Sequence, residues 1–459
     1  MLLLDHSARL THEHAKRHLE FPFEVPPGAA RLRIEMHYAP RKVDGQIATN
    51  ELSLTLFDPN GARGAGHHRL DHRVELSAAA ATPGYVPGPL PAGRWVVVVD
   101  THMILPGPVV EMRLTAEVSF EPVAAPAPTP APRRAGGRGP GWYRGDLHGH
   151  TLHSDGSWDV PDLVAAARAA GLDFVTLSDH NTVSGLAQMD GLGDSALLTM
   201  GGVELTTYYG HALALGVREW IDWRTRPGAR TMEDIAAEVR RRGGTFIIAH
   251  PMAPGDPICT GCNWNYPDMM PGSARIVEIW NGGIWSREDG YNERGLRLWY
   301  DWLNQGYRMV ATAGTDIHGF GDLEDVGMAA RAIEAGLNVV YAEDLTEAAI
   351  LAAVEQGHLY LSSGPALELT AESDGEATAM MGDALPTTRG RVLARWSNCR
   401  PTDTLRLIVD GGSVETISGM ESGACDWELN GRGWCALEVR AANGDLRAIT
   451  NPIFFARTD

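Results

Sequence analysis

The segment Asp146-Leu-His148-Gly-His150-Thr-Leu-His153-Ser-Asp155-Gly156 sets two histidines on alternate positions at the end of a predicted β-strand. Alternation along a strand puts His148 and His150 on one face, where both can reach the same ion. The turn that follows offers a carboxylate, Asp155. The histidine pair alone is equally compatible with a hydrogen-bonded structural pair, so its meaning depends on what the rest of the chain brings beside it.

Around this segment, residues 142–365 alternate short apolar strands with helical stretches. Strands are predicted at 174–177, 245–249, 275–280 and 309–312, and helices at 161–170 and 231–241. Pro161 suits the first turn of a helix, and Gly171 suits the end of one. This alternation predicts an α/β fold, either a TIM-like barrel or a doubly wound sheet.

Histidines and acidic residues recur at the ends of the predicted strands. In a parallel barrel these ends meet at one mouth, so the side chains are expected to converge there. Imidazole and carboxylate together suit Zn, Mn or Fe, whereas Ca²⁺ and Mg²⁺ favour oxygen ligands alone. One tetrahedral zinc needs four ligands, so the set indicates two or three ions. The candidate metal ligands are His148, His150, Asp155, His180, Glu204, His211, His250, Asp316 and His318.

The same motifs resemble the PHP (polymerase and histidinol phosphatase) superfamily of metallohydrolases over about residues 142–365. Gly202-Val-Glu204-Leu-Thr-Thr207, and Gly357-His-Leu-Tyr360 leading to Ser363-Gly364-Pro365, resemble the branch that includes carbaryl-type ester hydrolases. The resemblance implies a distorted (β/α)7 barrel with a di- or trinuclear site. It implies one ion on His148, His150, Glu204 and Asp316, a second bridged by Glu204 to His211 and His250, and a third on Asp155, His180 and His318.

Such a site predicts a metal-dependent hydrolase. Two ions can share a bridging hydroxide that serves as the nucleophile, and the chain has no Gly-x-Ser-x-Gly elbow to supply another. A phosphoesterase acting on a small-molecule phosphomonoester or phosphodiester is the leading hypothesis. A carboxylic or carbamate ester hydrolase keeps the same site. A partner- or glycan-binding protein with a vestigial metal site is the alternative of another class.

Further residues are candidates for narrower roles. Besides Glu204, Asp179 is a candidate catalytic residue, as a proton carrier or an orienter of His180, with a structural cap as the alternative. Arg287, Tyr208 and Trp264 are candidate substrate contacts. The alternative for Arg287 is a surface ion pair with Glu288 or Asp289, and for Tyr208 it is packing beneath the loop to His211.

The Cys259-Thr-Gly-Cys262 segment has the spacing of a zinc half-site but lacks a second pair. A surface loop is the favoured interpretation, and a redox pair or a loop staple is the alternative.

The regions on either side of residues 142–365 have a different pattern of apolar and polar residues. Residues 1–121 alternate like an antiparallel β-sandwich, residues 122–141 form a Pro/Ala/Gly linker, and residues 366–459 predict a small C-terminal β-domain. His67 and His68 stand in a Gly/Arg-rich loop of the first region and are expected to be solvated.

Composition limits the possible partners. The 459 residues carry a net charge of −19 without a basic stripe, which argues against an extended nucleic-acid surface but not against a small phosphorylated substrate. No run approaches the ~20 apolar residues of a membrane span. Five cysteines and an early polar start favour a cytoplasmic location. Homo-oligomerisation is left open.

Overall fold

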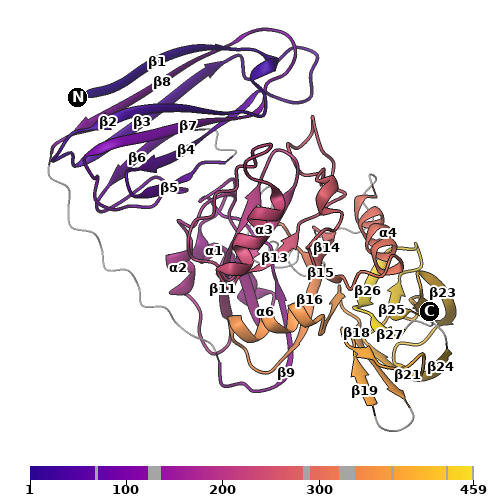
Figure 1. Cartoon of the computed structure of the whole chain (residues 1–459). Helices are drawn as coiled ribbons and strands as arrows, with labels where there is room; N and C mark the ends of the chain where they lie inside the picture. The colour runs from indigo at the N-terminus through magenta and orange to yellow at the C-terminus, as the bar shows by residue number, and fades with distance from the viewer. Residues whose placement is uncertain are drawn as a thin grey trace.

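The computed structural model describes residues 1–67, 71–121, 136–282, 290–319, 336–373, 377–430 and 433–456 (Figure 1). Most of the predicted linker, the expected surface residue His68 and the candidate substrate contact Arg287 therefore lie outside the described residues. The chain passes from an all-β N-terminal region through a central α/β region to a C-terminal region of strands (Figure 1).

The N-terminal region consists of two four-stranded antiparallel sheets that enclose a core of their own, with Trp95 and Leu56 among the buried side chains. Strand β8 shows why the sheets stack: buried and exposed residues alternate along it, so one face is apolar. One sheet runs in the order β1 (Leu2–Leu10), β8 (Val110–Ser119), β3 (Arg31–Ala39) and β6 (Arg73–Ser77). The other runs β2 (His18–Val25), β7 (Gly93–Met103), β4 (Glu51–Asp58) and β5 (Gly61–Ala65).

From β9 to β15 the central sheet carries the strands expected from the alternating pattern, with one reversal. Strands β9, β10 and β11 are parallel, as are β13, β14 and β15, but β12 runs antiparallel to both of its neighbours. The connection from Thr206 to His211 is too short for a crossover helix, so β12 must turn back as a hairpin. The strands are β9 (Gly141–Asp146), β10 (Phe174–Leu177), β11 (Leu198–Thr206), β12 (His211–Leu215), β13 (Thr245–Ile248), β14 (Ile276–Asn281) and β15 (Val310–Gly314).

This sheet curls without closing into a complete ladder. An isolated parallel bridge joins Gly149 to Ile317, just beyond the carboxyl ends of β9 and β15. The other edge of β15 is met by side-chain amides: Asn338 of β16 (Leu337–Ala342) pairs with the backbone of Ala313, and Asn451 pairs with that of Ala311. Over the described residues β9 and β15 share no ladder. The fold is therefore mixed α/β and rich in sheet, and the predicted closed TIM-like barrel is not confirmed.

Five α-helices accompany the described strands. Asp159 and Thr231 cap α1 and α3 at the positions where the sequence predicts helices to begin, and Gly171 follows α1 with a φ of +66°, a value that favours glycine. None of the helices in the described ranges is long and apolar enough to cross a membrane. The helices are α1 (Val160–Ala169), α2 (Leu186–Asp190), α3 (Met232–Arg241), α4 (Tyr291–Asn304) and α6 (Glu347–Gln356).

The C-terminal region extends the central sheet. From β16 the sheet continues through β17 (Leu359–Ser362), β26 (Leu446–Thr450), β25 (Trp434–Arg440), β22 (Thr404–Val409) and β23 (Gly412–Ser418). A separate sheet contains β19 (Ala377–Met380), β18 (Ala366–Ser373), β21 (Arg389–Ser397) and β24 (Gly423–Asn430), and the short strands β20 (Ala384–Leu385) and β27 (Ile453–Phe455) pair with each other. Hydrogen bonding thus continues across the predicted boundary at residue 365.

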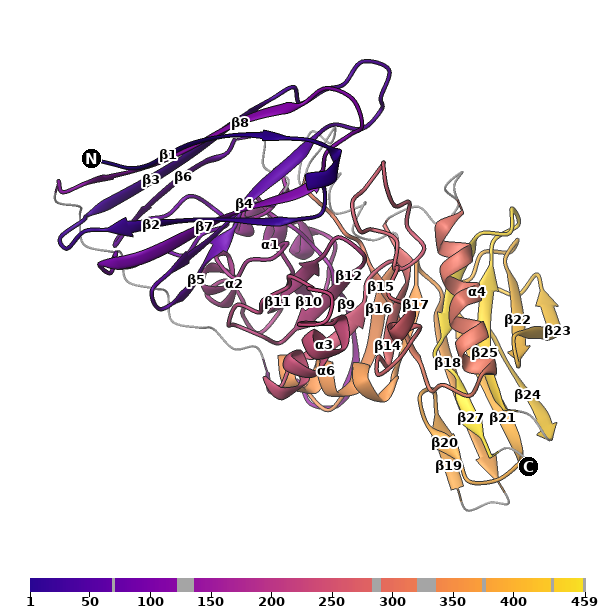
Figure 2. The same cartoon turned by 45° about the horizontal axis from the view of Figure 1, so that its top comes forward.

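The N-terminal sandwich packs on the central region through its second sheet (Figure 2). The Lys16 ammonium lies 2.6 Å from the Asp256 carboxylate, and the Thr182 hydroxyl donates to the Gly84 carbonyl at 2.6 Å. Phe57 packs edge-on against Trp220, with ring centroids 5.3 Å apart. These contacts join segments that the sequence analysis assigns to different domains.

Candidate metal centre

The nine candidate ligands gather at one edge of the central sheet. His148 and His150 follow β9, His180 follows β10, and His211 opens β12. Because β12 runs in reverse, His211 pairs with Thr206 at the end of β11 and so lies at the same edge as the ligands that follow the parallel strands. Three further ligands follow β13 and β15: His250, Asp316 and His318.

Local backbone structure holds several of these residues in place. An isolated bridge between His180 and Glu204 extends pairing beyond the end of β10. His250 and Asp316 have positive φ angles of 27° and 52°, which are uncommon for residues other than glycine. Such conformations persist where the surrounding structure fixes them and are found at functional sites.

Glu204 lies at the centre, with a histidine group on each of its two oxygens. Oε2 is 3.2 Å from His148 Nε2, 3.3 Å from His150 Nε2 and 2.9 Å from His180 Nδ1. Oε1 is 3.0 Å from His211 Nδ1 and 3.1 Å from His250 Nε2. A carboxylate placed in this way can bridge two ions.

Two sets of ligand atoms surround Glu204 closely enough to hold an ion. Asp316 Oδ1 is 2.9 Å from His150 Nε2 and 3.4 Å from His148 Nε2, which completes a group of His148, His150, Glu204 and Asp316. His180, Glu204 and His211 form another group. Within each group the ligand atoms lie within 4.8 Å of one another.

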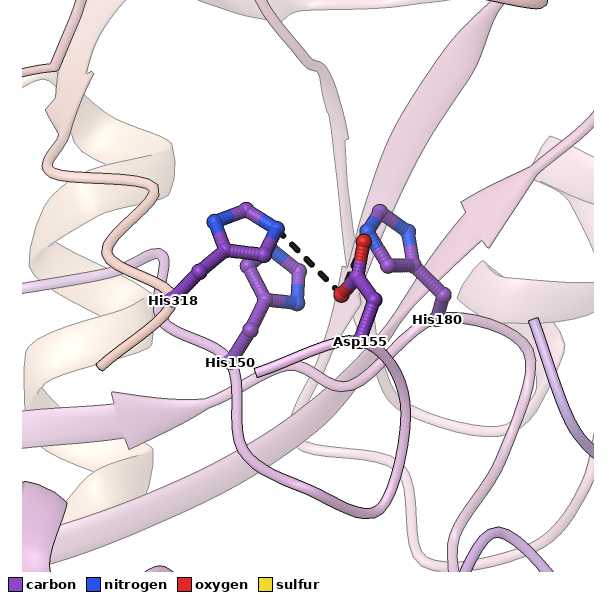
Figure 3. Close-up of side chains that lie close together, drawn as sticks. All are labelled: His150, Asp155, His180 and His318. Atoms are coloured by element: carbon purple, nitrogen blue, oxygen red, sulfur yellow. Dashed lines mark ion pairs between the residues drawn. The ribbon is translucent and has the colours of Figure 1, made fainter. Parts of the chain in front are cut away.

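A third group lies on the more open side and contains His150, Asp155, His180 and His318 (Figure 3). Asp155 Oδ1 is 3.5 Å from His180 Nε2 and 3.3 Å from His318 Nε2, and Figure 3 shows the four side chains turned toward one another. The His318 side chain is 39% exposed, whereas those of His148, His150 and Glu204 are fully buried. Access from solvent therefore comes from the His318 side.

The donor set fits transition-metal ions. Over the described residues, the buried atoms His148 Nε2, His150 Nδ1 and Glu204 Oε2 meet no partner in hydrogen-bond geometry, although Glu204 Oε2 lies at ion-pair distance from His148 and His150. Leaving polar atoms unpaired in this way is costly unless an ion or water satisfies them. Imidazole nitrogens with carboxylate oxygens are the donors that zinc, manganese and iron accept, so each group suits a divalent ion.

The charges of the ligands support the same conclusion. Burial would raise the pKa of Glu204, but His180, His148 and His211 hold it well below its usual range. Burial would lower the pKa of His150, yet the neighbouring carboxylates of Asp316 and Glu204 raise it to about 10. These directions favour the ionised carboxylate, and a divalent ion would have to displace the imidazole proton in order to bind.

Sequence reasoning missed the residues behind the ligands. The Glu278 carboxylate lies 2.9 Å from His148 Nδ1 and accepts from the Asn281 amide at 2.7 Å, and this amide also reaches Asp316 Oδ2 at 3.2 Å. The signal was present in the sequence, since a single acidic residue inside the apolar strand β14 has to find a partner when buried.

Asp179 is tied to the turn that carries Asp155. Its carboxylate accepts from the Thr151 amide and hydroxyl, both at 2.7 Å, and from the Ser154 hydroxyl at 2.6 Å. Its side chain is buried. Asp179 therefore has a structural contact with this earlier turn, whereas the structural alternative placed it on the turn that follows, and a role in proton transfer stays a prediction.

The predicted substrate contacts have other surroundings. Tyr208 donates to the Arg17 carbonyl at 2.8 Å and stacks on His18, so its ring lies between the sandwich and the central region. Trp264 is buried and donates to the Met269 carbonyl at 2.8 Å. Arg287 lies outside the described residues. Substrate contact by these three residues stays a prediction.

His67 corrects an expectation of the sequence analysis. The residue is only 1% exposed, and its ring centroid lies 4.6 Å from that of His180. The predicted solvated loop is therefore wrong for His67, because the sandwich packs against the central region at this point. The Gly/Arg-rich composition indicates a loop, but it does not reveal that the central region packs against this loop.

No protein-family model and no curated protein matches the chain. Solved structures resemble it weakly. A two-domain protein from Bacteroides vulgatus containing a predicted PHP-like metal-dependent phosphoesterase is 14% identical, with a TM-score of 0.36 over 69% of this chain and 96% of that one. A proposed metal-dependent phosphoesterase from Bifidobacterium adolescentis is 17% identical, with a TM-score of 0.30 over 41% and 94%.

An amidohydrolase from Chromobacterium violaceum, with bound sulfate and no metal, is 16% identical, with a TM-score of 0.28 over 39% of this chain and 91% of that one. Likenesses at this level assign neither a family nor an activity, so any function has to rest on the geometry of the site.

Proposed function

We propose that this protein is a metal-dependent hydrolase of phosphate esters. The observation that carries the proposal is Glu204, whose two oxygens each face a separate group of histidines. A carboxylate shared between two ligand groups could hold two ions at the short separation of a two-metal site. Two or three divalent ions of zinc, manganese or iron would supply Lewis acidity and an activated water when bound.

The chain's own residues would divide the remaining work. His148, His150 and Asp316 would hold one ion with Glu204, and His211 and His250 would hold a second on the other oxygen. Asp155, His180 and His318 would hold a third and orient a substrate entering from the exposed side. Against the three ligand carboxylates and the buried Glu278, two divalent ions would balance the negative charge and three would leave a positive excess, and with three ions the site would favour an anionic phosphoryl group over a neutral ester.

The test combines metal analysis with a substrate screen on one preparation. After reconstitution with Mn²⁺, Zn²⁺ or Fe²⁺, at least two ions per chain and hydrolysis of p-nitrophenyl phosphate or bis-p-nitrophenyl phosphate are expected. Glu204→Gln should lower activity by more than about 100-fold and release metal, because it removes a charged ligand. Glu219→Gln is the matched control, since the Glu219 side chain is 83% exposed.

Three outcomes would redirect the proposal. Hydrolysis of p-nitrophenyl acetate alone would favour a carboxylic or carbamate ester. Fewer than one bound ion per chain, together with no hydrolysis of any tested ester, would contradict the proposal that the protein is an enzyme. Glu204→Gln without any loss of hydrolysis would favour a binding protein with a vestigial site.

A further inference from the structure

The loop from Cys259 to Cys262 lies directly behind the two histidines on the Oε1 side of Glu204. His211 has Nδ1 at 3.0 Å from this oxygen, and its Nε2 is 3.2 Å from the Thr260 carbonyl. His250 has Nε2 at 3.1 Å from the same oxygen, and its Nδ1 is 3.3 Å from the Cys262 carbonyl. Each ring thus turns one nitrogen toward the candidate ion position and the other toward the loop.

A disulfide closes this loop. Cys259 and Cys262 are bonded, with their Cα atoms 5.6 Å apart, and both residues are half-buried. Between them Thr260 is buried, and Gly261 has a φ of +78°. A Cβ at Gly261 would stand 2.0 Å from the Thr207 carbonyl oxygen, so the loop is fitted closely against the connection between β11 and β12.

We propose that the Cys259–Cys262 disulfide is a positioning device for the ion held by His211 and His250. By holding the Thr260 and Cys262 carbonyls, the bond fixes which nitrogen of each histidine carries the proton and which is available as a ligand. Outer partners of this kind typically contribute about 10–100-fold to metal affinity. The inference rests on the metal-binding part of the proposed function but not on any hydrolytic activity.

Reduction of the bond should weaken one ion selectively. A dithiol donates two electrons and two protons to the S–S bond, both cysteines become thiols, and the dithiol becomes a disulfide. The loop then loses its closure, and the two carbonyls are no longer held. The ligands on the other side are oriented by other groups: His148 by Glu278, His180 by Thr206, and His318 by the Asp316 carbonyl.

The test is a Co²⁺ titration of the full chain, followed by absorption, on the oxidised protein and on protein reduced with dithiothreitol and desalted anaerobically. Thiol counting should find three free thiols before reduction and five after, since five cysteines are present and two are bonded. One ion is expected to bind about 10–100-fold more weakly after reduction, and re-oxidation should restore its affinity.

Variants separate the loop from general damage. The double variant Cys259→Ser, Cys262→Ser should match the reduced protein and should not respond to dithiothreitol. Cys425→Ser, at a half-buried free cysteine, is the matched control and should behave as the unmodified protein. Gly261→Ala keeps both cysteines but pushes the loop from the Thr207 carbonyl, so it should weaken the same ion.

The results distinguish this inference from the proposed function. Equal Co²⁺ affinities in both redox states, with thiol counts of three and five, would overturn the positioning role and leave the metal site intact. Five free thiols in the untreated, aerobically purified protein would also overturn it. No Co²⁺ binding in either state would overturn both this inference and the metal-dependent activity.

Discussion

At the scale of single residues, the buried carboxylate of Glu278 connects His148 with Asn281, whose amide also reaches Asp316. It accepts from Asn281 and faces His148 Nδ1 at 2.9 Å, which leaves His148 Nε2 for the side of Glu204. A carboxylate behind a ligating histidine fixes its tautomer and raises its basicity. Glu278 therefore belongs to the site although it is not one of the nine candidate ligands.

Glu278→Gln is expected to weaken binding of the ion on His148 by about 10-fold or more, because a neutral amide replaces the charged partner. A Co²⁺ titration of the full chain measures this change, and thermal unfolding shows whether the fold is kept. Glu219→Gln serves again as the exposed control. Unchanged affinity for every ion would contradict the role given to Glu278.

Asp179 allows its two interpretations to be separated. If Asp179 holds the turn that carries Asp155, Asp179→Asn should lower the free energy of unfolding by about 1–3 kcal/mol. The variant loses a buried carboxylate that accepts three hydrogen bonds. Metal occupancy and kcat should then fall together. A lower kcat with full metal occupancy and an altered pH profile would instead support proton transfer by Asp179.

The candidate ligands were predictable because their positions follow from local sequence. Polar residues directly after apolar strands have to lie at the sheet edge, and His148, His180 and His250 do so. Glu278 was not predicted, since its role depends on contact with a strand 130 residues away. The carbonyls behind His211 and His250 were not predicted either, because backbone groups leave no mark in a sequence.

At the scale of elements, Gly314 at the end of β15 lies against Glu278 of β14 and against His148, which follows β9. A Cβ at this position would stand 2.3 Å from Glu278 Oε2 and 2.5 Å from His148 Cβ. Only a residue without a side chain leaves room for both groups. The last residue of β15 therefore helps to set the position of a candidate ligand that follows β9.

Gly314→Ala is expected to lower the free energy of unfolding by about 1–3 kcal/mol through overpacking, and to weaken metal binding by displacing His148 or Glu278. Chemical denaturation and a Co²⁺ titration measure the two effects. Gly141→Ala, at the start of β9, is the matched control, because the nearest atoms to its added Cβ lie 4.0 Å away. Equal stability of the two variants would contradict the close approach.

The sequence predicted the types of most elements better than their arrangement. α1 and α3 begin at Val160 and Met232, within one residue of the predicted starts, because Asp159 and Thr231 are strong capping residues. The reversed direction of β12 was not predicted, since an apolar run has the same pattern in either direction. The shared sheet after residue 365 depends on pairings between distant strands, which periodicity does not encode.

At the scale of the whole molecule, the sandwich lies over part of the central region (Figure 2). His67 lies against His180, and Tyr208 reaches the Arg17 carbonyl. The surroundings of the site are thus made by two regions of the chain. Removal of a contact between the two regions should therefore lower the free energy of unfolding more than it changes the kinetics of hydrolysis.

Tyr208→Phe tests this relation. The variant loses the hydrogen bond to the Arg17 carbonyl, so the free energy of unfolding should fall by about 1 kcal/mol while KM for p-nitrophenyl phosphate stays unchanged. Tyr307→Phe is the control, since Tyr307 is 38% exposed. A several-fold rise in KM without loss of stability would instead support the predicted substrate contact by Tyr208.

The side-chain amides along β15 have a consequence for the order in which the chain can fold. Ala311 receives its partner from Asn451, which is synthesised 140 residues later. On the ribosome, β15 leaves the exit tunnel well before its edge can be completed, and an open strand edge invites wrong pairing. The edge of the strand that precedes Asp316 and His318 is therefore complete only when the C-terminal region is present, and we expect the candidate metal centre to gain this support late in biosynthesis.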